Sequence, residues 1–194
     1  MAKSAKFDRQ DVIDKATSLY WKKGFHATSM RNLQDEIDMR PGSIYATFGS
    51  KDGLFKETLR NYTDMGLAQM HDFAARNDSP LSTLKAFVKA QVIDTQSDAP
   101  NGMCMLSKTL GELTEEHQEL IDITKSHLNE ISDAIASLIE QAKDAGEVDQ
   151  NKDANELAQH VQIQIAGLRT FAKITNDKVL LERKIDAVFE HYPF

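Results

Sequence analysis

Hydrophobic residues recur every three to four positions along almost the whole chain, which is the period of amphipathic helices. In residues 8–23 this pattern begins after Asp8, a good N-cap residue, and stops at Gly24. The same reading predicts further helices over residues 30–37, 41–48, 51–76, 80–96, 103–110, 114–146, 153–174 and 177–191. No stretch alternates hydrophobic and polar residues for long enough to predict a strand. The sequence therefore predicts an all-α fold of about nine helices.

Three breaks in the helical pattern matter for the organisation of the chain. At residues 38–41 the pattern stops before Pro41, because the residue that precedes a proline is disfavoured in helices. Pro41 itself suits the first position of the next helix, and Ser50 suits the cap of the one after. The segment with the strongest loop character is 97–102, which reads Ser-Asp-Ala-Pro-Asn-Gly.

Composition narrows the class of protein. The chain has 194 residues, of which 41% are hydrophobic and 27% charged, and its single cysteine, Cys104, excludes an internal disulfide. Neither an apolar run of membrane-spanning length nor a signal-peptide pattern at the N-terminus is present. These features predict a cytoplasmic globular protein with no membrane partner.

The charge is distributed unevenly. Residues 1–60 carry 11 Lys and Arg against 8 Asp and Glu, a balance of +3. Residues 61–194 carry 12 against 22, a balance of −10, which gives the net charge of −7. This distribution indicates that only the front of the chain meets a polyanion.

The spacing of the second and third helices points to nucleic acid. A helix of about nine residues, a four-residue break and a helix of about seven make a helix-turn-helix, whose second helix enters the major groove of DNA. An ordinary helical hairpin has the same spacing, so the residue types must distinguish it from a DNA-binding helix-turn-helix. Small, polar or basic residues recur here, as phosphate contacts and close approach require: Thr28, Ser29, Arg31, Arg40, Ser43, Tyr45, Thr47 and Lys51.

The residues 24–33, Gly-Phe-His-Ala-Thr-Ser-Met-Arg-Asn-Leu, and 41–55, Pro-Gly-Ser-Ile-Tyr-Ala-Thr-Phe-Gly-Ser-Lys-Asp-Gly-Leu-Phe, resemble the DNA-binding domain of the TetR family of repressors. The resemblance covers residues 8–60. It departs from the family pattern at Gln34, where Ala is usual, at Asp38, where Gly is usual, and at Arg40, where Ser or Thr is usual.

The resemblance implies a DNA-binding domain over residues 1–50 and an effector-binding and dimerisation domain over residues 51–194. It implies phosphate contacts for Thr28, Tyr45 and Lys51, and positions near the bases for Arg40, Pro41, Ser43 and Ile44. For Arg40, a bidentate contact to guanine and a phosphate contact both remain open. The full set of expected DNA-contacting residues is Thr28, Ser29, Arg40, Pro41, Ser43, Ile44, Tyr45, Thr47 and Lys51.

In the family, the last two helices pack against a second subunit. Apolar residues at helical spacing in these two helices predict either a homodimer interface or the core of the single subunit. The residues expected at the interface are Val161, Ile165, Leu168, Phe171 and Val188.

The resemblance also implies a small-molecule effector, for which Cys104, Met65 and Met105 are candidate contacts. Cys104 has two further interpretations, because it follows a loop and precedes a short helix. It is either a redox-sensing thiol or a small packed hydrophobe.

Other chemistry is sparse in the sequence. The six histidines occur singly, and no spacing typical of a metal site, a phosphate-binding loop or a catalytic motif is present. The expected function is a homodimeric repressor that an effector releases from double-stranded operator DNA, with no cofactor and no enzymatic activity. The alternatives are a redox-sensing repressor using Cys104 and an all-helical enzyme or interaction module with an incidental helix-turn-helix.

Overall fold

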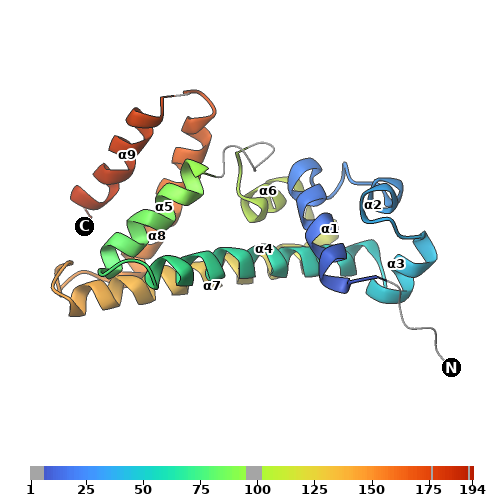
Figure 1. Cartoon of the computed structure of the whole chain (residues 1–194), viewed down its shortest axis with the longest axis horizontal. Coiled ribbons are helices and arrows are strands. Elements are labelled where there is room, and N and C mark those ends of the chain that lie inside the picture. Colours follow the sequence, from blue (N-terminus) through green and yellow to red (C-terminus); the bar gives the residue numbers. More distant parts are fainter. Residues whose placement is uncertain (1–6, 95–101, 176, 192) are drawn as a thin grey trace. The chain divides into compact units, whose positions relative to one another are not determined.

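A computed structural model describes residues 7–94, 102–175, 177–191 and 193–194. These residues form helices and no strands (Figure 1), so the predicted all-α class is confirmed. The helices are α1 (Arg9–Lys23), α2 (Met30–Ile37), α3 (Pro41–Phe48), α4 (Lys51–Ala74), α5 (Pro80–Val92), α6 (Met105–Glu112), α7 (Gln118–Asp144), α8 (Ala154–Ala172) and α9 (Lys178–Glu190). The predicted loop at 97–102 lies outside the described residues apart from Gly102. None of the helices in the described ranges is both long and apolar enough to cross a membrane.

The predicted helix starts are confirmed by their caps. Asp8 accepts a hydrogen bond from the Gln10 amide, and Ser29 forms a capping box with Asn32. Ser50 accepts from the amide of Gly53 in the first turn of α4. The helix expected from Thr114 differs: it opens with a short 3₁₀ turn, Glu115–His117, and α7 proper begins at Gln118.

The chain divides into two compact units whose boundaries differ from a division at residue 50. The first contains residues 1–64 and 105–127, and the second contains residues 65–104 and 128–194. Helix α6 therefore belongs to the same unit as the helix-turn-helix, although some 60 residues separate them in sequence. Its Lys108 side chain contacts the C-terminal end of α1.

An aromatic and aliphatic core supports the first unit. Tyr20 packs edge-on against Phe55 with ring centroids 4.7 Å apart, and Phe25 lies 4.9 Å from the same ring. Phe48 of α3 and Leu54 of α4 are also buried in this unit. The contact between Tyr20 and Phe55 packs α1 against α4.

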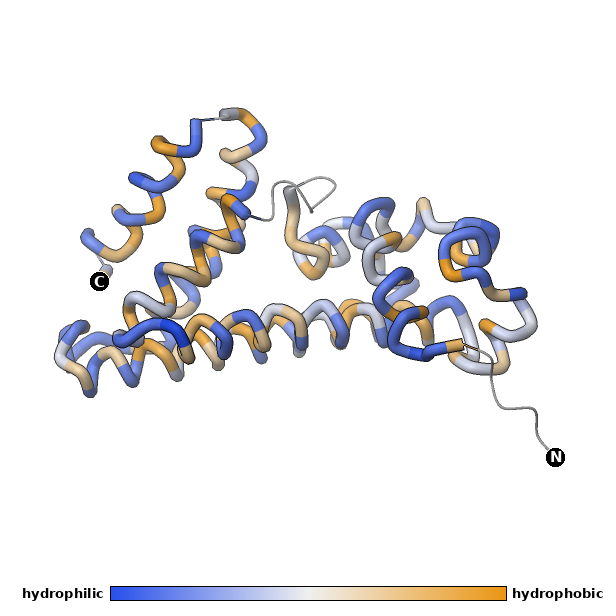
Figure 2. The backbone as a smooth tube through the Cα atoms, in the orientation of Figure 1, coloured by the Kyte–Doolittle hydropathy of each residue, from blue (hydrophilic) through white to orange (hydrophobic). Residues whose placement is uncertain are grey.

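The second unit is built on α5, α8 and α9, which contact one another in all three pairs. Figure 2 shows hydrophobic residues recurring between hydrophilic ones along α8 and α9. The structure places Val161, Leu168 and Val188 in the core of this unit, with Ile165 and Phe171 packed at its edge. Val161, Leu168 and Val188 are therefore buried in the subunit's own core, whereas Ile165 and Phe171 are only partly buried and their place at a subunit interface stays a prediction.

Candidate nucleic-acid interface

The α2–α3 pair has the geometry expected of a helix-turn-helix because its turn is tightly determined. Asp38, at the end of α2, adopts the left-handed conformation with φ 52° and ψ 44°. Glycine adopts this conformation at no steric cost, which explains why the family prefers glycine here. Asp38 keeps the turn geometry at a cost of about 1 kcal/mol.

Helix α3 exposes most of its first two turns. Pro41, Gly42 and Ser43 are exposed, Tyr45 is 49% exposed, and Thr47 is half-buried. Arg40 directly precedes α3, and its backbone carbonyl accepts hydrogen bonds from the amides of the helix's first turn. Its exposed side chain makes no capping hydrogen bond. A short helix with small side chains and one guanidinium at its N-terminus can enter a major groove and donate to base edges.

Two of the expected contact residues lie inside the protein. Thr28 is 0% exposed, and its hydroxyl donates a 2.6 Å hydrogen bond to the Gly24 carbonyl. Ile44 is also 0% exposed and belongs to the core beneath α3. In this structure both side chains pack inside the protein, and their contacts with DNA stay a prediction. Ser29 is exposed, but its hydroxyl is engaged in the capping box of α2.

Lys51 is positioned by the turn between α1 and α2. Its ammonium donates a 2.6 Å hydrogen bond to the Phe25 carbonyl and lies 4.2 Å from the centroid of the Phe25 ring. Partial burial lowers the pKa of this ammonium from its ordinary value. A phosphate contact from Lys51 stays a prediction, and the ammonium already has partners within the protein.

Residues of α6 that the sequence did not single out hold the same turn. The Glu112 carboxylate accepts hydrogen bonds from the amides of Phe25, at 3.0 Å, and His26, at 2.6 Å. The Lys108 ammonium donates to the carbonyls of Trp21 and Lys22 at the end of α1. No local pattern reveals such contacts, because they join positions 86 or 87 residues apart.

The candidate effector residues are divided between the units. Met105 is fully buried in the first unit, and its contact with an effector stays a prediction. Met65 and Cys104 fall in the second unit, where Met65 is exposed and the free thiol of Cys104 is half-buried. Within the described residues, no group of three or more His, Cys, Asp or Glu side chains is placed to hold a metal ion.

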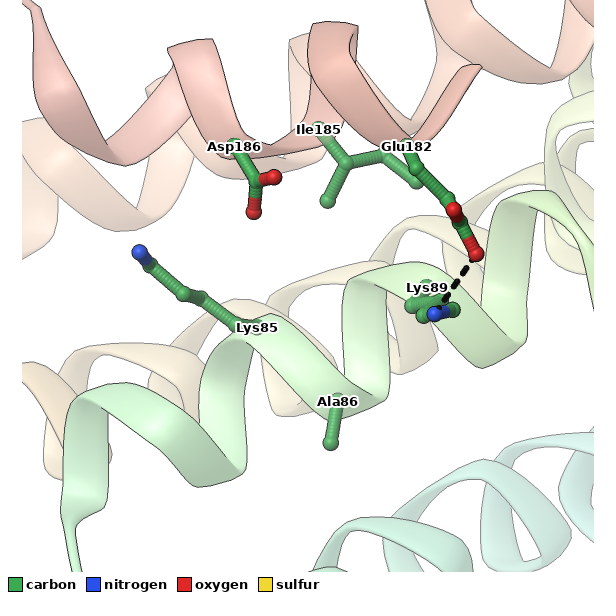
Figure 3. A pocket seen from close by; sticks show the side chains of 6 residues that line it. All are labelled: Lys85, Ala86, Lys89, Glu182, Ile185 and Asp186. Carbon is green, nitrogen blue, oxygen red and sulfur yellow. Dashed lines mark ion pairs between the residues drawn. The ribbon is translucent and has the colours of Figure 1, made fainter. Parts of the chain in front are cut away.

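A hollow of about 200 Å³ lies between α5 and α9 in the second unit. Figure 3 shows its charged lining, in which Lys89 and Glu182 form a 2.7 Å ion pair and Lys85 faces Asp186. Ligand pockets usually enclose about 300–1,000 Å³ and are mostly apolar. This hollow therefore lacks the character expected of an effector site.

Comparison with known proteins places the N-terminal and the C-terminal parts of the chain in one family. Residues 12–58 match the family described as bacterial regulatory proteins, tetR family, and residues 80–188 match the tetracyclin repressor-like C-terminal domain. The chain is 26% identical over 176 residues to the HTH-type transcriptional repressor ComR of Escherichia coli K12, covering 86% of this chain and 80% of ComR. It is 36% identical over 76 residues to the repressor BdcR of the same organism, covering 39% of this chain and 38% of BdcR.

Solved structures show the same fold. A cysteine mutant of the TetR family regulator CifR, complexed with 26-bp operator DNA, has a TM-score of 0.85 at 23% identity and covers 98% of this chain and 100% of its own. FadR from Bacillus subtilis, in complex with stearoyl-CoA, has a TM-score of 0.77 at 13% identity, with coverages of 94% and 98%. One family match covers the helix-turn-helix and the other covers more than half of the chain, so this protein belongs to the TetR family of DNA-binding transcriptional regulators.

Proposed function

We propose that the protein is a homodimeric repressor that reads operator DNA with α3 and releases it when a small molecule occupies the second unit. The observation that carries this proposal is the exposed N-terminal half of α3, preceded by the exposed Arg40 and supported by a buried core. The two family matches favour this function over an enzyme or an interaction module with an incidental helix-turn-helix. A protein that acts on bacterial operator DNA works in the cytoplasm.

The charge distribution supports an encounter through the N-terminal segment alone. The +3 balance of residues 1–60 favours approach to phosphates, whereas the −10 balance of the rest opposes it. Exposed Arg40, Ser43 and Tyr45 supply donors for the groove and the phosphates that flank it.

The exposed side of α8 is the surface we assign to the subunit interface. Ile163 is 68% exposed, and Ala166, Gly167 and Thr170 follow it on the same side of the helix, opposite the core. Small residues allow a second helix to approach closely, and Ile163 supplies apolar area to bury. Two further exposed apolar residues, Ile174 (79%) and Val179 (65%), flank the connection between α8 and α9.

An effector of this repressor must bind the DNA-incompetent form more tightly than the DNA-competent form, because otherwise it shifts no population. We expect an apolar or amphipathic molecule. The second unit has an extensive aliphatic core, and the structurally similar FadR was solved with stearoyl-CoA.

Selection of bound sequences from random duplexes with the purified protein tests the proposal. The expected result is a pseudo-palindrome whose half-sites are spaced by about one helical turn or a multiple of it. Recovery of no enriched sequence would contradict the proposal. The selected duplex then serves to screen amphipathic metabolites for release of the protein.

Cys104 supports a second candidate function, a thiol-sensing repressor. Its half-buried free thiol lies directly before α6, the helix that holds the α1–α2 turn. Replacing it, Cys104→Ser, keeps the size of the side chain and removes the thiol chemistry. Loss of oxidant-induced DNA release in this variant, with operator affinity retained, would establish the sensing role, and an unchanged response would exclude it.

A further inference from the structure

Two charged side chains of α6 form hydrogen bonds with the backbone of the end of α1 and the α1–α2 turn. Lys108 and Glu112 are four residues apart and therefore lie on one side of α6. The Lys108 ammonium donates to the carbonyls of Trp21, at 3.2 Å, and Lys22, at 3.0 Å. The Glu112 carboxylate accepts from the amides of the two residues that follow Gly24. We call Lys108 and Glu112 the α6 clamp; both belong to the same compact unit as the turn.

The charges of the clamp suit the backbone groups that they meet. The last carbonyls of a helix have no partner within the helix and carry partial negative charge, which a lysine satisfies. The amides of the turn are donors, which a carboxylate satisfies with charge-assisted hydrogen bonds. Glycine suits position 24 because its φ is 89°, and a Cβ atom there would also displace the Glu112 carboxylate.

The clamped turn continues directly into the DNA-reading helices. The Gly24 carbonyl accepts the Thr28 hydroxyl just before α2, and the Phe25 carbonyl accepts the Lys51 ammonium at the start of α4. The Phe25 ring packs on Phe55 and, edge-on at 5.0 Å, on His117. A change in this turn therefore alters the supports at both ends of the α2–α3 pair.

We infer that Lys108 and Glu112 are positioning residues for DNA binding, which hold the α1–α2 turn in the conformation that operator recognition requires. Residues 102–104, directly before α6, belong to the second compact unit, so the chain passes from that unit straight into the clamp helix. The inference extends the proposed function, because effector occupancy that shifts α6 would then loosen the turn. Its effect on DNA affinity is measurable without any effector.

The test compares two variants that each remove one negative charge from the same unit. Glu112→Gln leaves one carbonyl oxygen, without charge, for two amides. The matched control is Glu119→Gln, because Glu119 is exposed and its carboxylate pairs with the Lys56 side chain. Loss of a negative charge alone strengthens attraction to phosphates, so the control should bind DNA as tightly as the parent protein or more tightly.

We expect Glu112→Gln to bind a duplex selected from random DNA by the parent protein about 10-fold more weakly, the effect of losing one charge-assisted hydrogen bond. For a scrambled duplex, Glu112→Gln and Glu119→Gln should show the same change in affinity relative to the parent protein. Amide hydrogen exchange at Phe25 and His26 should accelerate, while exchange within α1 stays that of the parent. Lys108→Met should weaken binding of the selected duplex more than Lys15→Met, which removes the same charge from an exposed position of the same unit. This pair gives a second measurement if Glu112→Gln folds poorly.

Equal affinity of Glu112→Gln and Glu119→Gln for the selected duplex, with exchange at Phe25 and His26 unchanged, would overturn the inference. So would equal affinity of Lys108→Met and Lys15→Met for that duplex. Failure of the parent protein itself to enrich any duplex would instead overturn the proposed function. The two failures are therefore distinguishable.

Discussion

At the scale of single residues, the DNA-binding motif combines residues that face solvent with residues that build its support. Thr28 and Ile44 are part of the motif by sequence, yet both are fully buried. Arg40, Ser43 and Tyr45 are exposed on or beside α3. A motif in a single sequence does not separate these roles, because a buried threonine and a phosphate-binding threonine look identical until burial is known.

Thr28→Val distinguishes the two roles for that residue. The valine has nearly the same shape but cannot donate to the Gly24 carbonyl, so we expect the free energy of unfolding to fall by about 1–2 kcal/mol. Affinity for a scrambled duplex should stay that of the parent protein, because no phosphate contact is lost. Chemical denaturation and a DNA titration measure the two effects. Weaker binding of the folded variant to the selected and the scrambled duplex alike would show that Thr28 contacts a phosphate.

The contacts of Lys108 and Glu112 could not be predicted from the sequence. Caps such as Asp8 and Ser29 were predictable because each acts within four residues of itself. The partners of Lys108 and Glu112 are 86 or 87 residues away, and the side chains themselves look like ordinary surface charges. Even so, Gly24 carried a signal, since a glycine at a helix end leaves room for a close approach.

At the scale of elements, hydrophobic periodicity located the helices but did not say what each apolar stripe faces. On α8 the predicted stripe of Val161 and Leu168 packs in the subunit's own core, while Ile163 on the opposite side is exposed. Periodicity identifies the most hydrophobic side of a helix. Where a helix packs on two sides, the most hydrophobic side faces the core of its own subunit. A subunit interface of small residues leaves a weaker pattern.

Ile163→Lys tests the exposed side of α8 as the dimer interface. Burying an isoleucine contributes about 1.5–3 kcal/mol, and in a two-fold interface the loss occurs twice, with two lysines brought together. We therefore expect a monomer at micromolar concentration by analytical ultracentrifugation, with weaker binding to a two-half-site duplex. Ser82→Lys, at an exposed position on α5, adds the same charge and should stay dimeric. A dimeric Ile163→Lys protein with unchanged affinity would place the interface elsewhere.

His160 on α8 makes the stability of the second unit dependent on pH. Burial lowers the pKa of His160 below its ordinary value of 6.5, and its ring lies 6.3 Å from that of Phe194. The unfolded chain therefore binds a proton more readily than the folded one, so stability falls as the pH drops through 6.5 towards the lower folded pKa. His160→Asn should lose less stability than the parent between pH 7 and 5.

Thermal unfolding at several pH values measures this difference. His71→Asn is the control, because His71 is exposed on α4. Parallel pH profiles for the parent protein and His160→Asn would show that protonation of His160 does not oppose folding.

At the scale of the whole molecule, the fold class and family followed from the sequence, but the division into compact units did not. Helix α6 belongs with the DNA-binding helices, although a boundary near residue 50 separates them in sequence. In the proposed repressor, the contact of Lys108 and Glu112 with the α1–α2 turn therefore lies inside the DNA-binding unit. The chain reaches that contact from the unit proposed to bind the effector.

The most direct test of DNA reading by α3 is methylation interference on the selected duplex. Methylation of guanine N7 blocks the major groove, so we expect loss of parent binding at two symmetry-related groups of guanines, spaced by about one helical turn or a multiple. With Arg40→Ala, one guanine in each half-site should cease to interfere if Arg40 reads a base. Interference confined to adenine N3, in the minor groove, with none at guanine N7, would contradict recognition of the major groove by α3.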